Sequence, residues 1–188
     1  MSTDSETVQA SWADPECFAV LYDRHAVTVY RYLTRRLGRQ AAEDVMAETF
    51  LVAFDARHTY DLTRPDARPW LLGIATNLTN RHLRSEARRA VFQARAVPVP
   101  ERDETEAVVE NLDHTAGTSA VMRALARLSD PDRDCVVLYA WGQLTYEEIA
   151  ASVGIPVGTV RSRLHRARRT LRTLLTPTPV ALEDSHHG

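Results

Sequence analysis

The sequence contains no lysine, and only two of its residues are cysteines. All 23 basic residues are therefore arginines, whose planar guanidinium groups suit bidentate contacts with phosphate and guanine. Cys17 and Cys135 fall in different helical patterns, so they predict neither a disulfide framework nor a metal site. No apolar run approaches the roughly 18 residues of a membrane span, and no basic-then-apolar signal opens the chain. We therefore expect a soluble cytoplasmic protein with no membrane insertion.

Motifs that carry catalytic chemistry are also missing. The chain has no glycine-rich phosphate loop and no H-E-x-x-H sequence, and its Asp, His and Ser residues are scattered without a catalytic motif. His165 has no second candidate ligand at a suitable spacing, so no metal is expected. These absences predict a protein that is not an enzyme, has no catalytic residues and needs no cofactor.

The first half of the chain shows three helical patterns. An Asp-Pro-Glu sequence at residues 14–16 marks a helix start, because Asp caps helices, Pro fits the first turn and an acid favours the positive end of the helix dipole. This first pattern breaks at Gly38. Two further helices are predicted at about 40–56 and 69–89. The patterns define a first domain over residues 14–89, and the polar residues 1–13 are expected to be loose.

Residues 90–117 differ in composition from the rest of the chain. Positions 97–117 hold six acids, one arginine and two prolines. Such a segment buries too little apolar surface to fold alone, so it predicts a flexible acidic linker. Helical patterning resumes over residues 118–175, and residues 176–188 predict a disordered tail. The expected fold class is all-α, with two small helical domains joined by the linker.

A helix-turn-helix motif is predicted in the second domain. Its expected helices cover about 118–128, 131–141, 145–152 and 156–175. Thr145 and Glu148 form a T-x-x-E capping box, Gly154 permits a tight turn, and Pro156 opens the last helix. A helix, a short glycine-containing turn and a second helix are the signature of this DNA-binding motif.

The last predicted helix concentrates arginine on one side. At about 100° per residue, an apolar stripe faces the core, and the opposite side is small, polar and cationic. A helix that enters the major groove needs such a side. Six arginines without acidic partners one turn away would repel one another, which favours DNA binding over an ordinary solvated face. The candidate DNA contacts are Arg161, Ser162, His165, Arg166 and Arg169, together with Thr145, which is more a cap than a contact.

A second polar surface is predicted along residues 68–89. Its asparagines can read a base edge and its arginines can meet phosphates, although exposed asparagines are common on ordinary surfaces. Trp70 is better explained by core packing than by base stacking. This face comprises Gly73, Thr76, Asn77, Asn80 and Arg84, with Arg81 and Arg88 at its edge.

The helix predicted at about 40–56 is acidic. It carries Glu43, Asp44, Glu48 and Asp55. An acidic face with an apolar margin suits a basic protein partner better than DNA. Taken alone, the segment is explained more simply by an ordinary solvated face.

Together, these segments resemble the extracytoplasmic-function (ECF) group of bacterial RNA polymerase sigma factors, within the sigma-70 family. AEDVMAETFLVAF at 42–54 is similar to region 2.2, and RPWLLGIATNLTNRHLRSEAR at 68–88 is similar to regions 2.3 and 2.4. Residues 125–168, which contain GTVRSRLHRAR, are similar to region 4. The resemblance covers about residues 16–175, in the family's order and separation.

The resemblance implies three sets of contacts. Core RNA polymerase would be bound through its β′ clamp helices and its β flap, with the clamp helices contacted by Asp44, Val45 and Glu48. A flipped base of the −10 promoter element would be captured by Asn77 and the loop just before it, with Asn80 and Arg81 nearby and Arg84 and Arg88 on the DNA backbone. The −35 element would be read by Arg161, Ser162, His165 and Arg166.

The resemblance implies promoter recognition and DNA opening by a dissociable polymerase subunit, with an anti-sigma factor as a further candidate partner. Ala47 stands where the family often has Gln, so we expect a weaker or re-shaped contact with the β′ clamp helices. Two alternatives remain from the residues alone. One is a free-standing, dimeric helix-turn-helix regulator, and the other is an enzyme or adaptor whose active surface lies in residues 16–89.

Overall fold

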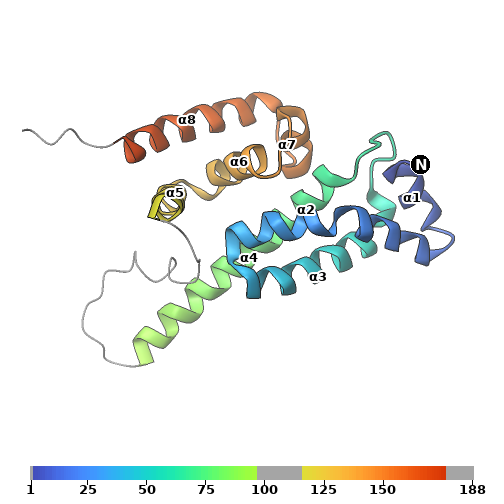
Figure 1. Cartoon of the computed structure of the whole chain (residues 1–188), viewed down its shortest axis with the longest axis horizontal. Coiled ribbons are helices and arrows are strands. Elements are labelled where there is room, and N and C mark those ends of the chain that lie inside the picture. Colours follow the sequence, from blue (N-terminus) through green and yellow to red (C-terminus); the bar gives the residue numbers. More distant parts are fainter. Residues whose placement is uncertain (1, 97–115, 177–188) are drawn as a thin grey trace, which may run out of the picture.

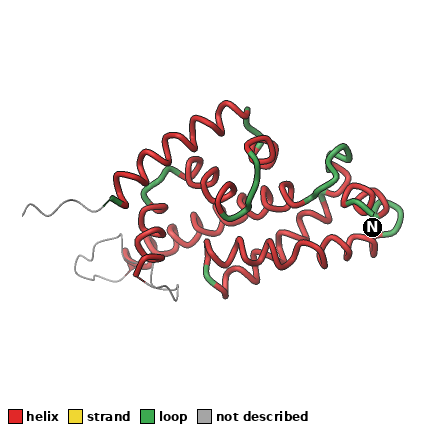
Figure 2. Tube along the Cα trace, turned by 45° about the horizontal axis from the view of Figure 1, so that its top comes forward, coloured by secondary structure: helices red, strands yellow, loops and turns green. Residues whose placement is uncertain are grey.

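The computed structural model describes residues 2–96 and 116–176, which are helical apart from short turns and loops (Figure 1, Figure 2). The elements are α1 (Asp4–Ala10), η1 (Pro15–Phe18), α2 (Ala19–Leu37), α3 (Arg39–Asp55), η2 (Arg57–Thr59), α4 (Arg68–Ala96), α5 (Ala116–Ala126), α6 (Asp130–Ala140), α7 (Tyr146–Val153) and α8 (Val157–Leu175). The described residues contain no strand, so the predicted all-α class is confirmed. The linker positions 97–115 and tail positions 177–188 lie outside the described residues. No described helix has the length and apolarity that a membrane span requires.

Helices α1–α4 form the first helical unit. Helices α2, α3 and α4 pack side by side, and their fully buried residues include Leu21, Leu33, Ala53 and Leu71. Buried apolar residues recur every three or four positions along each helix, so each helix turns one face toward a shared core.

Residues Asp4–Ala10 are helical, so the prediction that residues 1–13 are loose is wrong for the described part of that segment, residues 2–13. The Thr3 hydroxyl accepts a hydrogen bond from the Glu6 backbone N–H at 3.2 Å, and the Glu6 carboxylate accepts one from the Thr3 N–H at 2.7 Å. This capping box starts α1, and the fully buried Val8 anchors the helix to the core. Because residues 1–13 are mostly polar, the sequence did not predict this helix, which contacts such as that of Val8 hold in place.

Helix α4 extends past its predicted end at residue 89. It continues to Ala96, so the first residues assigned to the linker are helical. Residues 90–96 contain neither glycine nor proline, and the first helix-breaking residue is Pro98.

Helices α5–α8 form the second helical unit, and the predicted helix-turn-helix is confirmed. Helix α7 begins at the Thr145–Glu148 capping box. It ends at Gly154, whose φ of 66° lies in the left-handed region that glycine adopts without a steric penalty. Pro156 then caps α8, the second helix of the motif.

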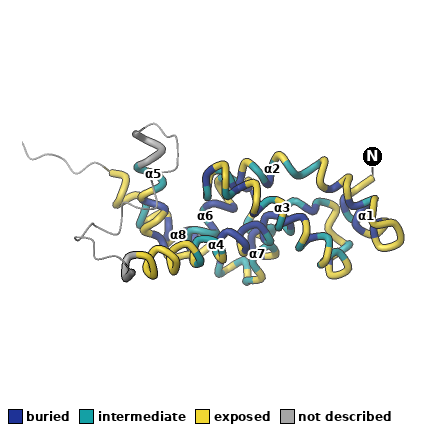
Figure 3. Tube along the Cα trace, turned by 90° about the horizontal axis from the view of Figure 1, so that it is seen from below, coloured by how far each residue is buried: buried dark blue, intermediate teal, exposed yellow. Residues whose placement is uncertain are grey.

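The two units share one continuous core, which the sequence did not predict. Helix α7 lies on the first turns of α4, where the Ser152 hydroxyl donates a hydrogen bond to the Pro69 carbonyl oxygen at 2.7 Å. A Cβ atom at Gly73 would lie only 2.4 Å from the Ser152 carbonyl oxygen, so only glycine allows this approach. Figure 3 shows buried residues where α4, α6 and α7 meet. We call this packing of α6 and α7 on α4 the closed arrangement.

Candidate nucleic-acid interface

Helix α8 turns its apolar side inward and its cationic side outward, as predicted. Val160 and Ala167 are fully buried, and Leu164 is 2% exposed. Gly158, in the first turn, has open space where a side chain would stand, so a ligand can approach the backbone there. The candidate −35 residues on this helix are all exposed: Arg161, Ser162, His165, Arg166 and Arg169. Their exposure leaves them accessible to DNA, and their role as contacts stays a prediction.

Thr145 is exposed at the start of α7 and caps that helix. Its hydroxyl oxygen accepts a hydrogen bond from the Glu148 N–H at 3.2 Å. Because a hydroxyl can accept and donate at the same time, its hydrogen is still able to reach a phosphate.

Arg166 is held in place by a partner on α6. Its Nε and Nη2 atoms donate to the two carboxylate oxygens of Asp132 at 2.7 and 2.6 Å. These hydrogen bonds lower the pKa of the Asp132 carboxyl, although its burial acts in the opposite direction. The Arg166 side chain is still 62% exposed, so part of its guanidinium faces solvent. Asp132 therefore fixes the orientation of a candidate base reader, and nothing in the sequence marked it for that role.

Arg168, a neighbour of Arg166 on α8, is turned toward aromatic side chains. Its guanidinium donates to the Tyr146 hydroxyl at 3.2 Å and lies 5.6 Å from the centre of the Tyr139 ring. This contact between a cation and an aromatic ring ties α8 to α6 and α7. Arg168 thus contributes to packing around the motif.

The polar face of α4 is partly covered, which corrects the prediction of an open surface there. Gly73 is buried beneath Ser152, and Thr76 is fully buried, with its hydroxyl 2.7 Å from the Tyr32 hydroxyl. Asn77 remains exposed. Asn80 is half-buried, and its amide donates to Asp134 on α6 at 2.7 Å. The closed arrangement therefore hides part of the surface that was predicted to meet the −10 element.

A buried ion pair joins the two units beside Asn80. The Arg36 guanidinium donates to Asp134 at 3.0 Å and to the Asn80 amide oxygen at 3.1 Å. Only 3% of the Arg36 side chain and 13% of the Asp134 side chain are exposed. Burial raises the pKa of the Asp134 carboxyl, and the charge and hydrogen bonds of its partners offset this only in part. This network determines how the two units pack against each other. If the units separated, water would again hydrate the Asp134 carboxylate, and this gain offsets part of the loss of the ion pair.

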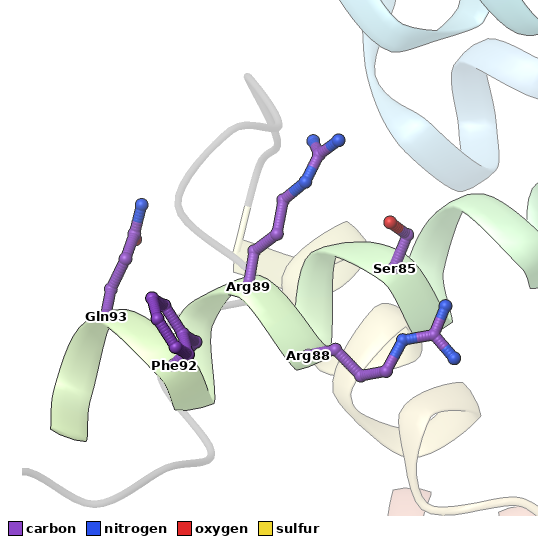
Figure 4. A pocket seen from close by; sticks show the side chains of 5 residues that line it. All are labelled: Ser85, Arg88, Arg89, Phe92 and Gln93. Atoms are coloured by element: carbon purple, nitrogen blue, oxygen red, sulfur yellow. The ribbon is translucent and has the colours of Figure 1, made fainter. Parts of the chain in front are cut away.

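The C-terminal half of α4 carries the exposed residues Arg84 and Arg88. One pocket combines Arg84 with Asp130 and Arg133 of α6. Another is formed by α4 alone and is lined by Ser85, Arg88, Arg89, Phe92 and Gln93 (Figure 4). In Figure 4 Arg88 points away from Arg89, so the two guanidinium groups leave the helix in different directions.

The acidic helix α3 presents some of its predicted polymerase contacts and buries another. Asp44 is exposed, and Glu48 forms an ion pair with Arg81 of α4. Val45 is only 3% exposed and belongs to the core. The structure therefore corrects the prediction for Val45, which supports α3 from inside because it lies on the helix face that packs against the rest of the unit.

Comparison with known proteins identifies the family. Residues 21–89 match the family model described as sigma-70 region 2, and residues 118–171 match sigma-70, region 4. The ECF RNA polymerase sigma factor SigL of Mycobacterium tuberculosis is 34% identical to this chain, in an alignment that covers 88% of the chain and 93% of SigL. The chain belongs to the ECF group of sigma-70-family sigma factors. The ECF sigma factor BldN of Streptomyces coelicolor is 35% identical over 90% of this sigma factor, which covers 64% of BldN.

A solved structure also shares the fold of this sigma factor. CnrH, in complex with the cytosolic domain of CnrY, aligns with a TM-score of 0.63 and 25% identity over 92% of this chain and 96% of CnrH. The relatives support the sigma-factor interpretation and not the free-standing regulator. Arg36 and Asp134, which join the two units, were missed in the sequence because neither belongs to a recognisable motif.

Proposed function

We propose that this sigma factor binds core RNA polymerase as a dissociable subunit, recognises the −35 and −10 promoter elements and promotes DNA opening. The observation that carries the proposal is the exposed cationic side of α8 within a helix-turn-helix. It occurs in one chain with the first helical unit, whose α4 bears an exposed Asn77 and exposed arginines. Holding both small units on one polymerase raises the effective concentration of the second DNA contact. This function requires no catalytic chemistry from the chain.

The proposal assigns each surface a role. The −35 element is read by Arg161, Ser162, His165 and Arg166, with Arg169 and Thr145 on its phosphates. An unpaired −10 base is held by Asn77 and the α3–α4 loop (residues 60–67), with Asn80 and Arg81 beside it and Arg84 and Arg88 on the backbone. Asp44 and Glu48 contact the β′ clamp helices, and the β flap is the proposed contact for the second unit. Extruding the base costs a few kcal/mol, so a protein that binds it favours the open state.

Promoter binding requires the closed arrangement to open. In the closed arrangement Asp134 and Arg36 bind the side chain of Asn80, and Ser152 covers Gly73. Two separate elements on a duplex cannot be read while the two units are packed together. We propose that core polymerase binds the units apart from each other and so uncovers α4.

An anti-sigma factor is a proposed second partner. An antagonist that stabilises the closed arrangement would keep the covered part of α4 away from DNA. CnrH, which shares the fold, was solved with a protein domain bound. Because bacterial RNA polymerase works in the cytoplasm, the proposed partners also place this chain there.

The test is transcription in vitro with purified core RNA polymerase. Genomic DNA of the source organism serves as the template, and the 5′ ends of the transcripts are sequenced. We expect defined start sites that depend on the added chain and that share two upstream sequence elements. The chain alone should bind duplex DNA weakly. A stable homodimer that binds a palindrome tightly without polymerase would contradict the proposal.

A further inference from the structure

The N-terminal segment, residues 2–14, contacts the chain just before the α3–α4 loop and again at the C-terminal end of the loop. On the side before the loop, the Trp12 indole N–H donates to the Arg57 carbonyl oxygen at 3.3 Å, and the Arg57 guanidinium donates back to the Ser11 carbonyl oxygen at 3.3 Å. The Trp12 ring also lies against His58, with the ring centres 5.3 Å apart and the ring planes tilted by 33°. Together these contacts fix the position of η2, from which the loop departs.

At the C-terminal end of the loop, a single carboxylate makes most of the contacts. Asp4 is 7% exposed, and its Oδ2 atom accepts the Ala67 N–H at 2.9 Å, just before α4 begins. The Asp4 N–H donates to the Pro65 carbonyl oxygen at 3.1 Å. Arg24 and His25 of α2 hold the carboxylate at 2.8 and 2.6 Å. Asp4 thus connects α1, α2 and the end of the loop.

The charge of Asp4 is maintained by these partners. Burial alone would raise the pKa of the Asp4 carboxyl, but the hydrogen bonds from Ala67, Arg24 and His25 outweigh it and lower the pKa. Asp66 lies close enough to Asp4 and His25 for the three to resemble a metal-binding group. Both oxygens of Asp4 are already used by hydrogen-bond donors, one of them a cationic guanidinium, so the cluster fixes the loop instead of binding a cation.

The loop itself is ordered and exposes its tip. The Asp61 carboxylate accepts hydrogen bonds from the Thr63 N–H at 3.1 Å and from the Arg64 guanidinium at 3.1 Å. The Tyr60 hydroxyl donates to the Arg64 carbonyl oxygen at 2.7 Å from a buried ring. Thr63 and Arg64 are exposed, so the tip stands on a framework fixed at both ends. The Thr63 hydroxyl donates to Asp61 at 2.6 Å, which leaves its oxygen as an acceptor, and the two terminal nitrogens of the Arg64 guanidinium as donors, for a ligand.

We propose that Asp4 is a positioning residue for −10 recognition, because it holds the α3–α4 loop in the one conformation that presents Thr63 and Arg64 to an unpaired base. This inference rests on the proposed function. The N-terminal segment lies outside residues 21–89, the part that matches the region 2 family model. Selectivity at the −10 element therefore depends on a helix beyond the matched region, which acts without touching DNA.

The test compares promoters that differ by one base in the −10 element, using the full chain with core polymerase. Asp4→Asn keeps the size of the side chain but removes its charge and one of its two acceptor oxygens, so either Arg24 or the pair of His25 and Ala67 loses its acceptor. The matched control is Glu6→Gln on the same helix, which removes one negative charge but retains an oxygen for the Thr3 N–H. We expect Asp4→Asn to reduce the preference for the best −10 base roughly three- to tenfold, which is the effect of losing one ordinary hydrogen bond. Glu6→Gln should match the wild type.

Amide hydrogen exchange on the free chain gives an independent reading. Asp4→Asn should speed exchange at Ala67, and Glu6→Gln should leave it unchanged. Trp12→Phe, which removes the indole N–H and leaves a smaller aromatic ring beside His58, should cause a smaller loss of selectivity in the same direction. This variant serves as the test if Asp4→Asn does not fold.

Three results would each overturn the inference. One is an equal loss of transcription from every promoter, and another is unchanged selectivity despite faster exchange at Ala67. Unchanged selectivity in Trp12→Phe, where it replaces Asp4→Asn, is the third. A wild-type chain that fails to initiate with core polymerase would instead overturn the proposed function, and the inference with it.

Discussion

Replacing Gly73 by alanine should separate the two helical units. The new Cβ would lie 2.4 Å from the Ser152 carbonyl oxygen and 3.1 Å from its carbon, both of which are backbone atoms of α7. Ordinary contacts begin at 3.4 Å, so α7 would have to retreat by about 1 Å. No side-chain rotation can relieve this clash, because the α4 and α7 backbones face each other directly.

The size of the effect follows from the cost of overpacking. Forcing an extra methyl group into a packed contact costs about 1–3 kcal/mol. At about 1.4 kcal/mol per factor of ten, the equilibrium shifts roughly 5- to 150-fold toward the open form. Alanine also favours the helical state of α4 by up to about 1 kcal/mol, but it does so in the closed and the open forms alike. The substitution should therefore open the molecule without unfolding it.

Small-angle X-ray scattering of the free chain measures this change. We expect Gly73→Ala to increase the radius of gyration while circular dichroism shows unchanged helix content. The matched control is Gly158→Ala in α8, where a Cβ meets nothing within 4 Å. Scattering curves that coincide for the wild type and both variants would refute the reasoning. Transcription is not used here, because Gly73 lies on the proposed −10 surface itself.

Three further predictions follow from the described contacts. Arg166→Ala should weaken initiation by about 1–3 kcal/mol at promoters that have the −35 element, and an equal loss at promoters lacking it would contradict base reading. Because the substitution also strips Asp132 of its partner, the melting temperature of the variant must be measured alongside. Asn77→Ala should impair DNA opening more than docking, since its side chain is exposed, and an unchanged permanganate footprint of the bubble would contradict this. Because folding lowers the pKa of Asp132, its carboxylate stabilises the fold at pH values above its unfolded-state pKa of about 4. This stabilisation is lost as the pH falls through the folded-state pKa of Asp132. The melting temperature should therefore fall less steeply between pH 7 and pH 3 for Asp132→Asn than for the wild type. An equally steep fall in both proteins would exclude a contribution of the Asp132 charge to stability.

Much of the secondary structure could be predicted because its causes are local. The capping box at Thr145 and the left-handed Gly154 act within one helical turn, so the sequence reveals them directly. The apolar stripe of α8 is equally local, and it correctly predicted which side of that helix faces outward. The start of α1 at Thr3 has the same kind of signal, but the helix needs buried contacts such as Val8 to persist.

The fit between the two units could not be predicted in this way. The sequence predicted an exposed polar face on α4, because its glycine and asparagines are typical of residues that contact solvent or a ligand. In the folded chain Gly73 lies directly against the Ser152 backbone of α7, and the Asn80 side chain forms hydrogen bonds with both members of the buried Arg36–Asp134 ion pair. The burial of Val45 is a smaller case of the same kind, because the family pattern does not specify which side of α3 packs inward.

The sequence by itself determined most of the helices, the helix-turn-helix and the cationic side of α8, because caps, turns and apolar periodicity act over a few neighbouring residues. Only the tertiary structure decided that the units close on each other, that Asp132 orients Arg166 and that Asp4 holds the α3–α4 loop. Arg36 and Asp134 stand 98 positions apart in the chain. No local pattern connects such residues, since their contact exists only after the helices between them have packed.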